Sequence, residues 1–336
     1  AVRQNIGIFD MSSFGKIRVE GEGALDFLQT ICTAQINIPI GRIVYTQMLN
    51  NKGGIESDLT VSRLGEKSFL LVVPCATLQR DLSYLNRENN SDKVIIIDTS
   101  SAEGVLSIMG PNSRKLLEAV SPNNFSNLSH PFGTWKNIEI GSGLARAHRV
   151  SYVGELGWEI YISSDQCAHV FEEIWKLQKE FNFNMCGIHA LDSCRIEKAY
   201  RHFGHDITDE DHVVDAGLCF TADLSKTYFK GKEAILKKRK IGSSKKMLQF
   251  KLNDPTKMIY HNEPIIRENK IVGYLTSGNY GHTLGGCVGL GYVDCKDLPN
   301  EEILSFEYKV DVAGEIVPAK TSLRSMYDPR SERVRM

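Results

Sequence analysis

The clearest alternation of apolar and polar positions lies at the end of the segment 149–162, where it follows a glycine-rich turn. Its apolar positions are Trp158, Ile160 and Ile162. A period of two predicts a strand with one buried face. Gly154 and Gly157 stand three apart in the turn, which predicts positive φ or a contact too close for a Cβ atom. Glu155 lies between them, so we expect a carboxylate held at a turn tip, with an ordinary hairpin as the alternative.

The same patterns predict the other elements. Alternation or short β-branched runs predict strands at residues 17–21, 44–49, 59–62, 68–73, 93–98 and 105–109. Apolar residues at helical spacing predict helices at residues 23–32, 76–86, 166–181 and 188–200. Pro111 is expected in the first turn of a further helix that ends at Leu117. This mixture of strands and helices predicts an α+β fold.

The last third of the chain has a different pattern. Residues 231–246 are rich in lysine and arginine, which indicates a solvated helix end and linker, or alternatively a surface for an anionic polyglutamate tail. From residue 247 onward, short strand patterns and glycine-rich turns predict an all-β domain.

Composition excludes several classes of protein. The 336 residues suffice for two or three domains, and 42% hydrophobic with 24% charged residues is ordinary globular usage. A net charge of -1 argues against a general nucleic-acid binder. We expect no membrane span, because no apolar run reaches about 18 residues, and no signal peptide is evident. Without a G-x-G-x-x-G or Walker motif, any flavin would have its domain elsewhere.

Cysteine and histidine patterns indicate neither a disulfide scaffold nor a metal site. The eight cysteines are scattered without a C-x-x-C pair, which predicts reduced thiols in a cytosol-like compartment and no cysteine nucleophile. His202 and His205 lack further ligands at suitable spacing, so we expect no metal. The chain begins with Ala1, which is compatible with a processed end or with a C-terminal piece of a larger polypeptide.

Four segments in order resemble the folate-binding aminomethyltransferase family. They are residues 50–61, 149–162, 187–198 and 273–282. The family comprises the glycine cleavage system T-protein and the C-terminal regions of dimethylglycine and sarcosine dehydrogenases. Residues 9–16, and the pair Tyr280 and His282, look closer to the dehydrogenase branch than to the T-protein.

The resemblance implies three domains in a clover-leaf with tetrahydrofolate in a central hole. We place domain 1 at residues 1–44 with 135–205, and domain 2 at residues 45–134 with 206–244. Domain 3, residues 245–336, would be the all-β, barrel-like C-terminal domain.

Asp58 is the expected catalytic residue. It follows a Gly-Gly turn and shares a strand face with Glu56, and a carboxylate at such a position can transfer protons or stabilise a cation. A turn-capping Asp is the alternative. The resemblance implies an acid/base aspartate here, although the T-protein pattern has two adjacent acids where this chain has Ser57 and Asp58.

Glu155 resembles the family's pterin-binding glutamate, because a carboxylate can accept both the ring N–H and the amino group of the pterin. The other residues expected to contact the cofactor are Tyr45, Met48, Tyr152, Trp158, Arg149 and Tyr280. The first four could sandwich the flat rings, with core packing as the alternative. The family pattern also implies that Arg195 and Glu197 hold domains together through buried ion pairs.

The implied function is that of an aminomethyltransferase-like enzyme of one-carbon metabolism and glycine catabolism. Folate N5 would attack an imine or aminomethyl carbon, an amine would leave, and closure on N10 would give 5,10-methylenetetrahydrofolate. The small amine or imine substrate would come from a flavin dehydrogenase domain or a lipoyl carrier protein. FAD is expected only in a larger flavoprotein. The location would be the cytoplasm, or the mitochondrial matrix in a eukaryote.

Two alternatives stay open. One is a folate-dependent methyltransferase or demethylase on the same fold, which would yield 5-methyltetrahydrofolate. The other is a non-catalytic regulatory module that need not bind folate.

Overall fold

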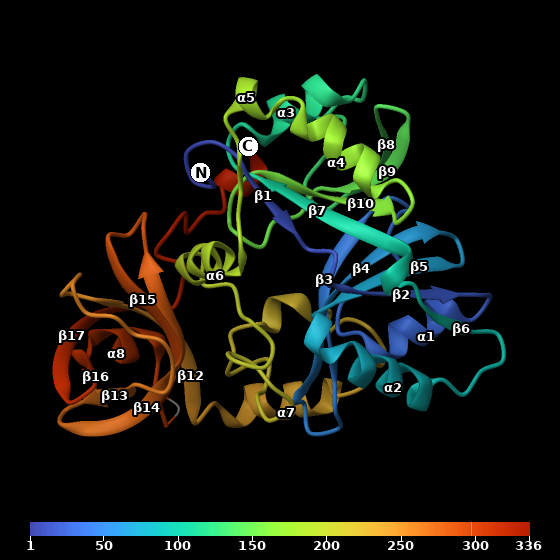
Figure 1. The fold of residues 1–336 in the computed structure, drawn as a ribbon. Helices are drawn as coiled ribbons and strands as arrows, with labels where there is room; N and C mark the ends of the chain where they lie inside the picture. Colours follow the sequence, from blue (N-terminus) through green and yellow to red (C-terminus); the bar gives the residue numbers. More distant parts are fainter. Residues whose placement is uncertain (297) are drawn as a thin grey trace.

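The computed structural model describes residues 1–296 and 298–336, and these form two sheets with their helices and a closed β-barrel (Figure 1). Helix α6 (Ile188–Glu197) lies between the first sheet and the barrel. The predicted α+β fold with a barrel-like C-terminal domain is confirmed.

The first sheet has the strand order β11-β1-β7-β10-β9-β8. Its strands are β1 (Gly7–Asp10), β7 (Glu103–Met109), β8 (Trp135–Ile140), β9 (Gly143–His148), β10 (Gly157–Ser163) and β11 (Asn184–Met185). Helices α3 (Ser113–Val120) and α4 (Cys167–Trp175) pack on one face, followed by α5 (Gln178–Phe181). Trp158, Ile160 and Ile162 of β10 enter this core. Since side chains alternate along a strand, Glu159 and Tyr161 belong to the opposite face.

The second sheet has the order β3-β4-β5-β2-β6. Its strands are β2 (Gly15–Glu20), β3 (Ile43–Leu49), β4 (Ile55–Gly65), β5 (Ser68–Val73) and β6 (Ile95–Asp98). Helices α1 (Ala24–Ile31) and α2 (Leu78–Glu88) cover the face that carries Leu59 and Val61. Asp58 and Ser62 alternate with these residues, so they belong to the face away from the helices.

The barrel closes in the order β12-β15-β14-β13-β16-β17, and its neighbouring strands are antiparallel. Its elements are β12 (Lys245–Leu252), β13 (Pro264–Arg267), β14 (Lys270–Gly281), β15 (Gly286–Asp294), α8 (Asn300–Ser305), β16 (Tyr308–Val312) and β17 (Glu315–Ser322). The strands begin at Lys245, where the sequence places the third domain.

Residues 198–244 connect α6 to the barrel and pack between the second sheet and the barrel. This segment contains the short 3-10 helix η3 (Cys219–Thr221) and α7 (Lys232–Ile241). Its Phe229 and Ile235 pack in one core with Leu49 of β3 and Leu290 of β15. The remaining 3-10 turns are η1 (Cys75–Thr77), η2 (Ser100–Ala102) and η4 (Arg333–Arg335).

Buried ion pairs at the end of α6 connect the bodies, as expected for Arg195 and Glu197. Arg195 pairs with Asp206 and contacts the Ser277 hydroxyl of β14. Glu197 pairs with Arg3 at 2.9 Å and accepts the backbone N–H groups of residues 283 and 284 in the barrel.

Strand pairing divides the chain differently from the predicted boundaries of the first two domains. β2 lies within residues 1–44, yet it pairs with β5 and β6 of the second sheet. β7 lies within residues 45–134, yet it pairs with β1 and β10 of the first sheet. Both assignments depend on hydrogen bonds between strands far apart in the sequence, which local patterns do not reveal.

Some helices and turns begin or end at residues other than those that the sequence predicts. Pro111 precedes α3, whose N-cap is Asn112. The helix predicted at residues 166–181 is two helices, α4 and α5. The helix predicted to residue 200 ends at Glu197, because Ala199 takes a positive φ of 55°, which terminates a right-handed helix. A long irregular connection, residues 149–156, replaces the predicted tight hairpin between β9 and β10.

The two glycines of that connection each meet one of the predicted requirements. Gly154 has a φ of 81°. Gly157 lies so close to β7 that an added Cβ atom would stand 2.1 Å from the Met109 sulfur and 2.8 Å from the Ile108 carbonyl oxygen. Positive φ explains the first glycine and close strand packing explains the second.

Across the residues that the structure describes, each helix is too short or insufficiently apolar to traverse a bilayer. In the same residues, no cysteine forms a disulfide.

Gly157→Ala should destabilise the protein by about 1–3 kcal/mol, because the methyl group overlaps Met109 and the β7 backbone. Urea unfolding measures the effect. Gly187→Ala is the matched control, since its Cβ would have no atom within 4 Å. Equal midpoints for the two variants would contradict the packing role of Gly157.

Candidate functional site

Asp58 lies on β4 beside two uncharged donors from β3. Its Oδ1 accepts a hydrogen bond from the Tyr45 hydroxyl at 2.6 Å and another from Gln47 Nε2 at 2.8 Å. Gln47 is the cross-strand partner of Asp58, and Tyr45 pairs with Thr60. The carboxyl group is therefore held by the pairing of two adjacent strands rather than by a flexible loop.

The protonation of Asp58 reflects its surroundings. Burial raises the pKa of this carboxyl to about 6, and the hydrogen bonds from Gln47 and Tyr45, together with Arg201, oppose that rise. Within the described residues, Asp58 forms no salt bridge; the Arg201 guanidinium donates to the Ala199 and Ala216 carbonyl oxygens. A carboxyl group with a pKa near 6 can both accept and return a proton at neutral pH.

Glu155 lies in a closed ion-pair network instead of at an open turn tip. It is 0% exposed, and its Oε1 accepts from Arg3 at 3.2 Å and from the Tyr327 hydroxyl. Arg333 lies 3.4 Å from Oε2. Desolvation nevertheless raises its pKa. Segments from both ends of the chain cover this carboxylate, and its Oε2 accepts no hydrogen bond from the described residues. The cofactor contact of Glu155 stays a prediction.

Glu159 is a second buried carboxyl group, which the sequence analysis did not select. It is 8% exposed and accepts a hydrogen bond from the Tyr161 hydroxyl at 2.8 Å. Burial raises its pKa to about 7, and no cation pairs with it in the part of the chain that the structure describes. The sequence signal that could have found it is its position: Glu159 stands between Trp158 and Ile160, on the other face of the same predicted strand.

Glu159 and Asp58 face the same space between the two sheets. Glu159 is the cross-strand partner of His148, so both point to the face without helices. His148 Nδ1 lies 3.5 Å from the Ser62 hydroxyl of β4. Ser62 shares its strand face with Asp58, and Tyr161 packs with Leu70 of the second sheet. Asp58 and Glu159 therefore belong to the two sheet faces that meet in this layer, whereas Glu155 lies in the ion-pair network with Arg3.

Tyr45 and Tyr152 lie near Asp58. Tyr45 is partly exposed, and its ring centroid is 6.4 Å from that of Phe220, which is 76% exposed. Tyr152 stacks on Tyr200 and donates to the Arg201 carbonyl oxygen at 2.8 Å. Burial raises the pKa of both Tyr45 and Tyr152. The Tyr45 ring thus lies beside the acid, and the exposed Phe220 ring lies next to Tyr45.

Core packing accounts for two of the other expected contacts. Met48 and Trp158 are fully buried in the cores of the second and first sheet. Arg149 is buried and donates to the carbonyl oxygens of His130 and Met336. Tyr280, on β14, accepts a hydrogen bond from Ser193 at its backbone oxygen and contacts the ring of His282.

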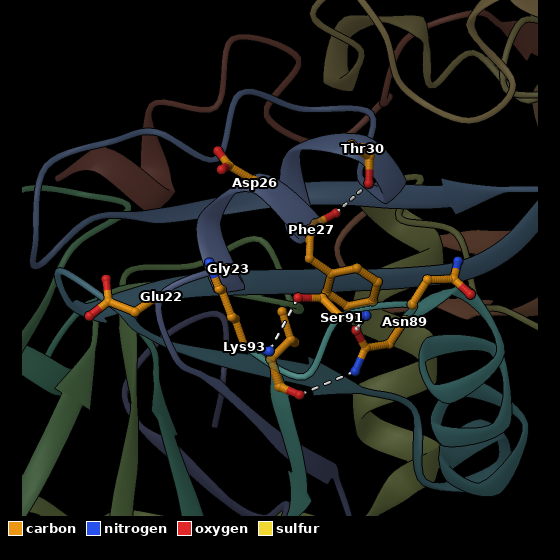
Figure 2. A pocket seen from close by; sticks show the side chains of 10 residues that line it. Glu22, Gly23, Asp26, Phe27, Thr30, Asn89, Ser91 and Lys93 are labelled. Carbon is orange, nitrogen blue, oxygen red and sulfur yellow. Dashed lines mark hydrogen bonds between the residues drawn. The ribbon is translucent and has the colours of Figure 1, made fainter.

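Other surface features lie outside this space. In the described residues, no group of three or more His, Cys, Asp or Glu side chains has the arrangement of a metal site. Figure 2 shows a pocket at the start of α1, lined by that helix and by residues 89–94. Asp26 and Lys93 are among its lining residues, and none of the predicted site residues is.

Comparisons with known proteins agree with this architecture. The chain is 38% identical to the 4-methylaminobutanoate oxidase (formaldehyde-forming) of Paenarthrobacter nicotinovorans and 32% identical to human mitochondrial sarcosine dehydrogenase. Both matches cover 100% of this chain, which spans 40% and 38% of those proteins. It is also 35% identical to an aminomethyltransferase of Halothermothrix orenii, with 94% of this chain and 88% of that protein covered.

A solved structure and two family models complete the comparison. The glycine cleavage system aminomethyltransferase T of Bartonella henselae superposes with a TM-score of 0.84 at 25% identity, covering 96% of this chain and 86% of that one. The GCVT N-terminal domain matches residues 1–226, and the glycine cleavage T-protein C-terminal barrel domain matches residues 245–328. The chain therefore belongs to the glycine cleavage T-protein family.

Proposed function

We propose that this chain transfers a one-carbon unit to tetrahydrofolate and yields 5,10-methylenetetrahydrofolate. The observation that carries the proposal is a pair of carboxyl groups on the facing surfaces of the two sheets, the buried Glu159 and the partly exposed Asp58, which have no cation partner in the described residues. Unpaired buried acids are costly to a fold, which indicates that a ligand completes them.

Glu159 is suited to hold the pterin. A carboxylate accepts the ring N–H and the adjacent amino group as a charge-assisted bidentate pair, and Glu159 keeps a small exposed area toward the inter-sheet space. We therefore assign the pterin edge to Glu159 in place of Glu155, whose Oε1 is occupied by Arg3 and Tyr327. A ligand without those donors would leave a buried anion unpaired, which gives selectivity.

Asp58 is suited to the reacting end. Tetrahydrofolate supplies two amine nitrogens, N5 and N10, that together accept the one-carbon unit. Asp58 Oδ2 would take the proton released as nitrogen bonds to the carbon, and would return a proton to the departing amine. The ionised carboxylate would also stabilise a cationic iminium substrate. Tyr45 and Phe220 would flank the aryl group attached at N10.

The source of the one-carbon unit follows from the relatives. We propose an imine or aminomethyl donor made by a flavin dehydrogenase domain or carried on a lipoyl protein. The oxidase and dehydrogenase relatives are much longer than this chain, whereas the aminomethyltransferase relative is of similar length. A reducing compartment, the cytoplasm or the mitochondrial matrix, suits the eight thiols.

Asp58→Asn should abolish most of the transfer, with a loss of about 10²–10⁴-fold in kcat, because the amide cannot accept a proton. Tetrahydrofolate binding measured by calorimetry should change little. The assay is the formation of 5,10-methylenetetrahydrofolate from tetrahydrofolate and the iminium ion of formaldehyde and methylamine, above the uncatalysed rate. Wild-type turnover in this variant would refute the role.

Glu159→Gln should weaken tetrahydrofolate binding by about 10–100-fold, because a charge-assisted pair becomes a mismatched neutral contact. Glu155→Gln is the matched comparison: it should lower the free energy of unfolding by about 3–5 kcal/mol, because Arg3 and Arg333 lose a buried anion, and leave folate affinity nearly unchanged. The reverse pattern in calorimetry and urea unfolding would restore Glu155 as the pterin ligand.

Transfer should rise with pH through about 6, because Asp58 must be ionised to accept a proton and its pKa is raised to that value. Below this pH the protonated carboxyl is inactive as a base. A rate profile with saturating tetrahydrofolate checks the midpoint, and Glu159→Gln separates it from the carboxyl with a pKa of about 7. A flat profile between pH 5 and 8 would argue against Asp58 as the base.

A further inference from the structure

Gln47 is a neighbour of Asp58 that the sequence analysis did not select. It is fully buried on β3, directly opposite Asp58 across the strand pair. Its Nε2 donates to Asp58 Oδ1 at 2.8 Å, and its Oε1 accepts from the Thr221 hydroxyl. A buried amide is costly unless both ends are hydrogen-bonded, and here both ends have a partner.

The Asp58 carboxylate and the Thr221 hydroxyl together orient the amide. Thr221 belongs to η3, in the segment between α6 and the barrel, and its single hydroxyl proton is shared between Gln47 Oε1 and the Leu218 carbonyl oxygen, which lies 2.8 Å away. A rotated amide would turn its oxygen toward the carboxylate, where two acceptors repel each other. The contacts therefore hold the NH₂ group against Asp58.

The two carboxyl oxygens of Asp58 consequently differ. Oδ1 accepts from both Tyr45 and Gln47, whereas Oδ2 accepts no hydrogen bond from the described residues. Because the side chain is partly exposed, Oδ2 is the oxygen that a ligand can reach.

We propose that Gln47 and Thr221 are positioning residues that fix the Asp58 carboxyl group so that Oδ2 meets the reacting nitrogen. The inference rests on the proposed function of Asp58 and adds to it a requirement for two residues that touch no substrate. The chain Thr221–Gln47–Asp58 also ties the catalytic strand to the turn that carries the exposed Phe220.

The test removes each of the two hydrogen bonds, Gln47 to Asp58 and Thr221 to Gln47, by substitution. Gln47→Leu keeps the volume but removes the donor, and Thr221→Val removes the hydroxyl that orients the amide. Each should lower kcat about tenfold or more at pH 7 and move the midpoint of the pH profile upward by about one unit, since a lost hydrogen bond disfavours the ionised acid. The dissociation constant of tetrahydrofolate should stay within about twofold.

Two controls separate positioning from packing. Thr221→Ser keeps the hydroxyl and should retain the wild-type profile. Thr46→Val removes a buried hydroxyl from the adjacent residue of the same strand, where it contacts Thr33 on the other side of β3. It should lower the stability without moving the midpoint. A midpoint that moves equally in Thr46→Val would reduce Gln47 to a packing residue and overturn the inference.

The titration of the Asp58 carboxyl group can also be measured without enzyme turnover. Carbon-13 NMR of aspartate-labelled protein, with the Asp58 signal assigned from Asp58→Asn, gives the carboxyl titration directly. The charged or titratable groups that act on Asp58 are Tyr45 from β3 and Arg201 after α6, and Asp58 in turn acts on Tyr152. Neither tyrosine titrates near pH 6, because burial raises the pKa of each. An Asp58 titration unchanged in Gln47→Leu and Thr221→Val would overturn the inference.

Failure of the proposed function and failure of the positioning role give different results. If Asp58→Asn keeps wild-type transfer, the proposed function of Asp58 fails and the positioning role fails with it. If Asp58→Asn is inactive while Gln47→Leu keeps the wild-type rate and midpoint, the function stands and the positioning role fails. Should Gln47→Leu not fold, Thr221→Val gives the same comparison from the far end of the chain of contacts.

Discussion

The pairing of buried charge around Arg3 is the constraint on which the arrangement of the bodies depends. Its guanidinium lies between Glu155 and Glu197, and Glu197 also accepts two backbone N–H groups from the barrel. A buried carboxylate that loses its partner costs several kcal/mol, so these elements cannot separate without exposing or stranding charge. The N-terminal segment, the β9–β10 connection, α6 and the barrel are thereby held in one geometry.

The same rule distinguishes the carboxyl groups between the two sheets from those around Arg3. Where Glu155 and Glu197 have cations, Asp58 and Glu159 have hydroxyl and amide donors, which stabilise an anion less than a guanidinium does. Burial raises the pKa values of Asp58 and Glu159 to about 6 and 7, and these neutral donors only partly oppose the rise. Carboxyl groups that are neutral or ionised with nearly equal ease near neutral pH can exchange protons and accept a ligand.

Local patterns in the sequence predicted most strands, the barrel-like C-terminal domain and the two glycines, and they singled out Asp58, whose role stays a proposal. They could not separate Glu155 from Glu159, because the decisive partner of Glu155 is Arg3, 152 residues away in the chain. Both acids lie in the same short segment. Which of them faces the second sheet depends on how β10 packs against that sheet. Strand pairing divides the chain differently from the predicted domain boundaries for the same reason, since β2 and β7 each pair with strands distant in sequence.

The choice of neutral donors at Asp58 also follows from the charge of the proposed substrate. A lysine or arginine in the place of Gln47 would hold the carboxyl ionised but would lower its basicity and repel a cationic iminium. Arg201 is near, yet its guanidinium donates to the Ala199 and Ala216 carbonyl oxygens, which keeps it directed away from the carboxyl. An amide and a phenol orient the acid without neutralising it, so the negative charge stays available where positive charge develops.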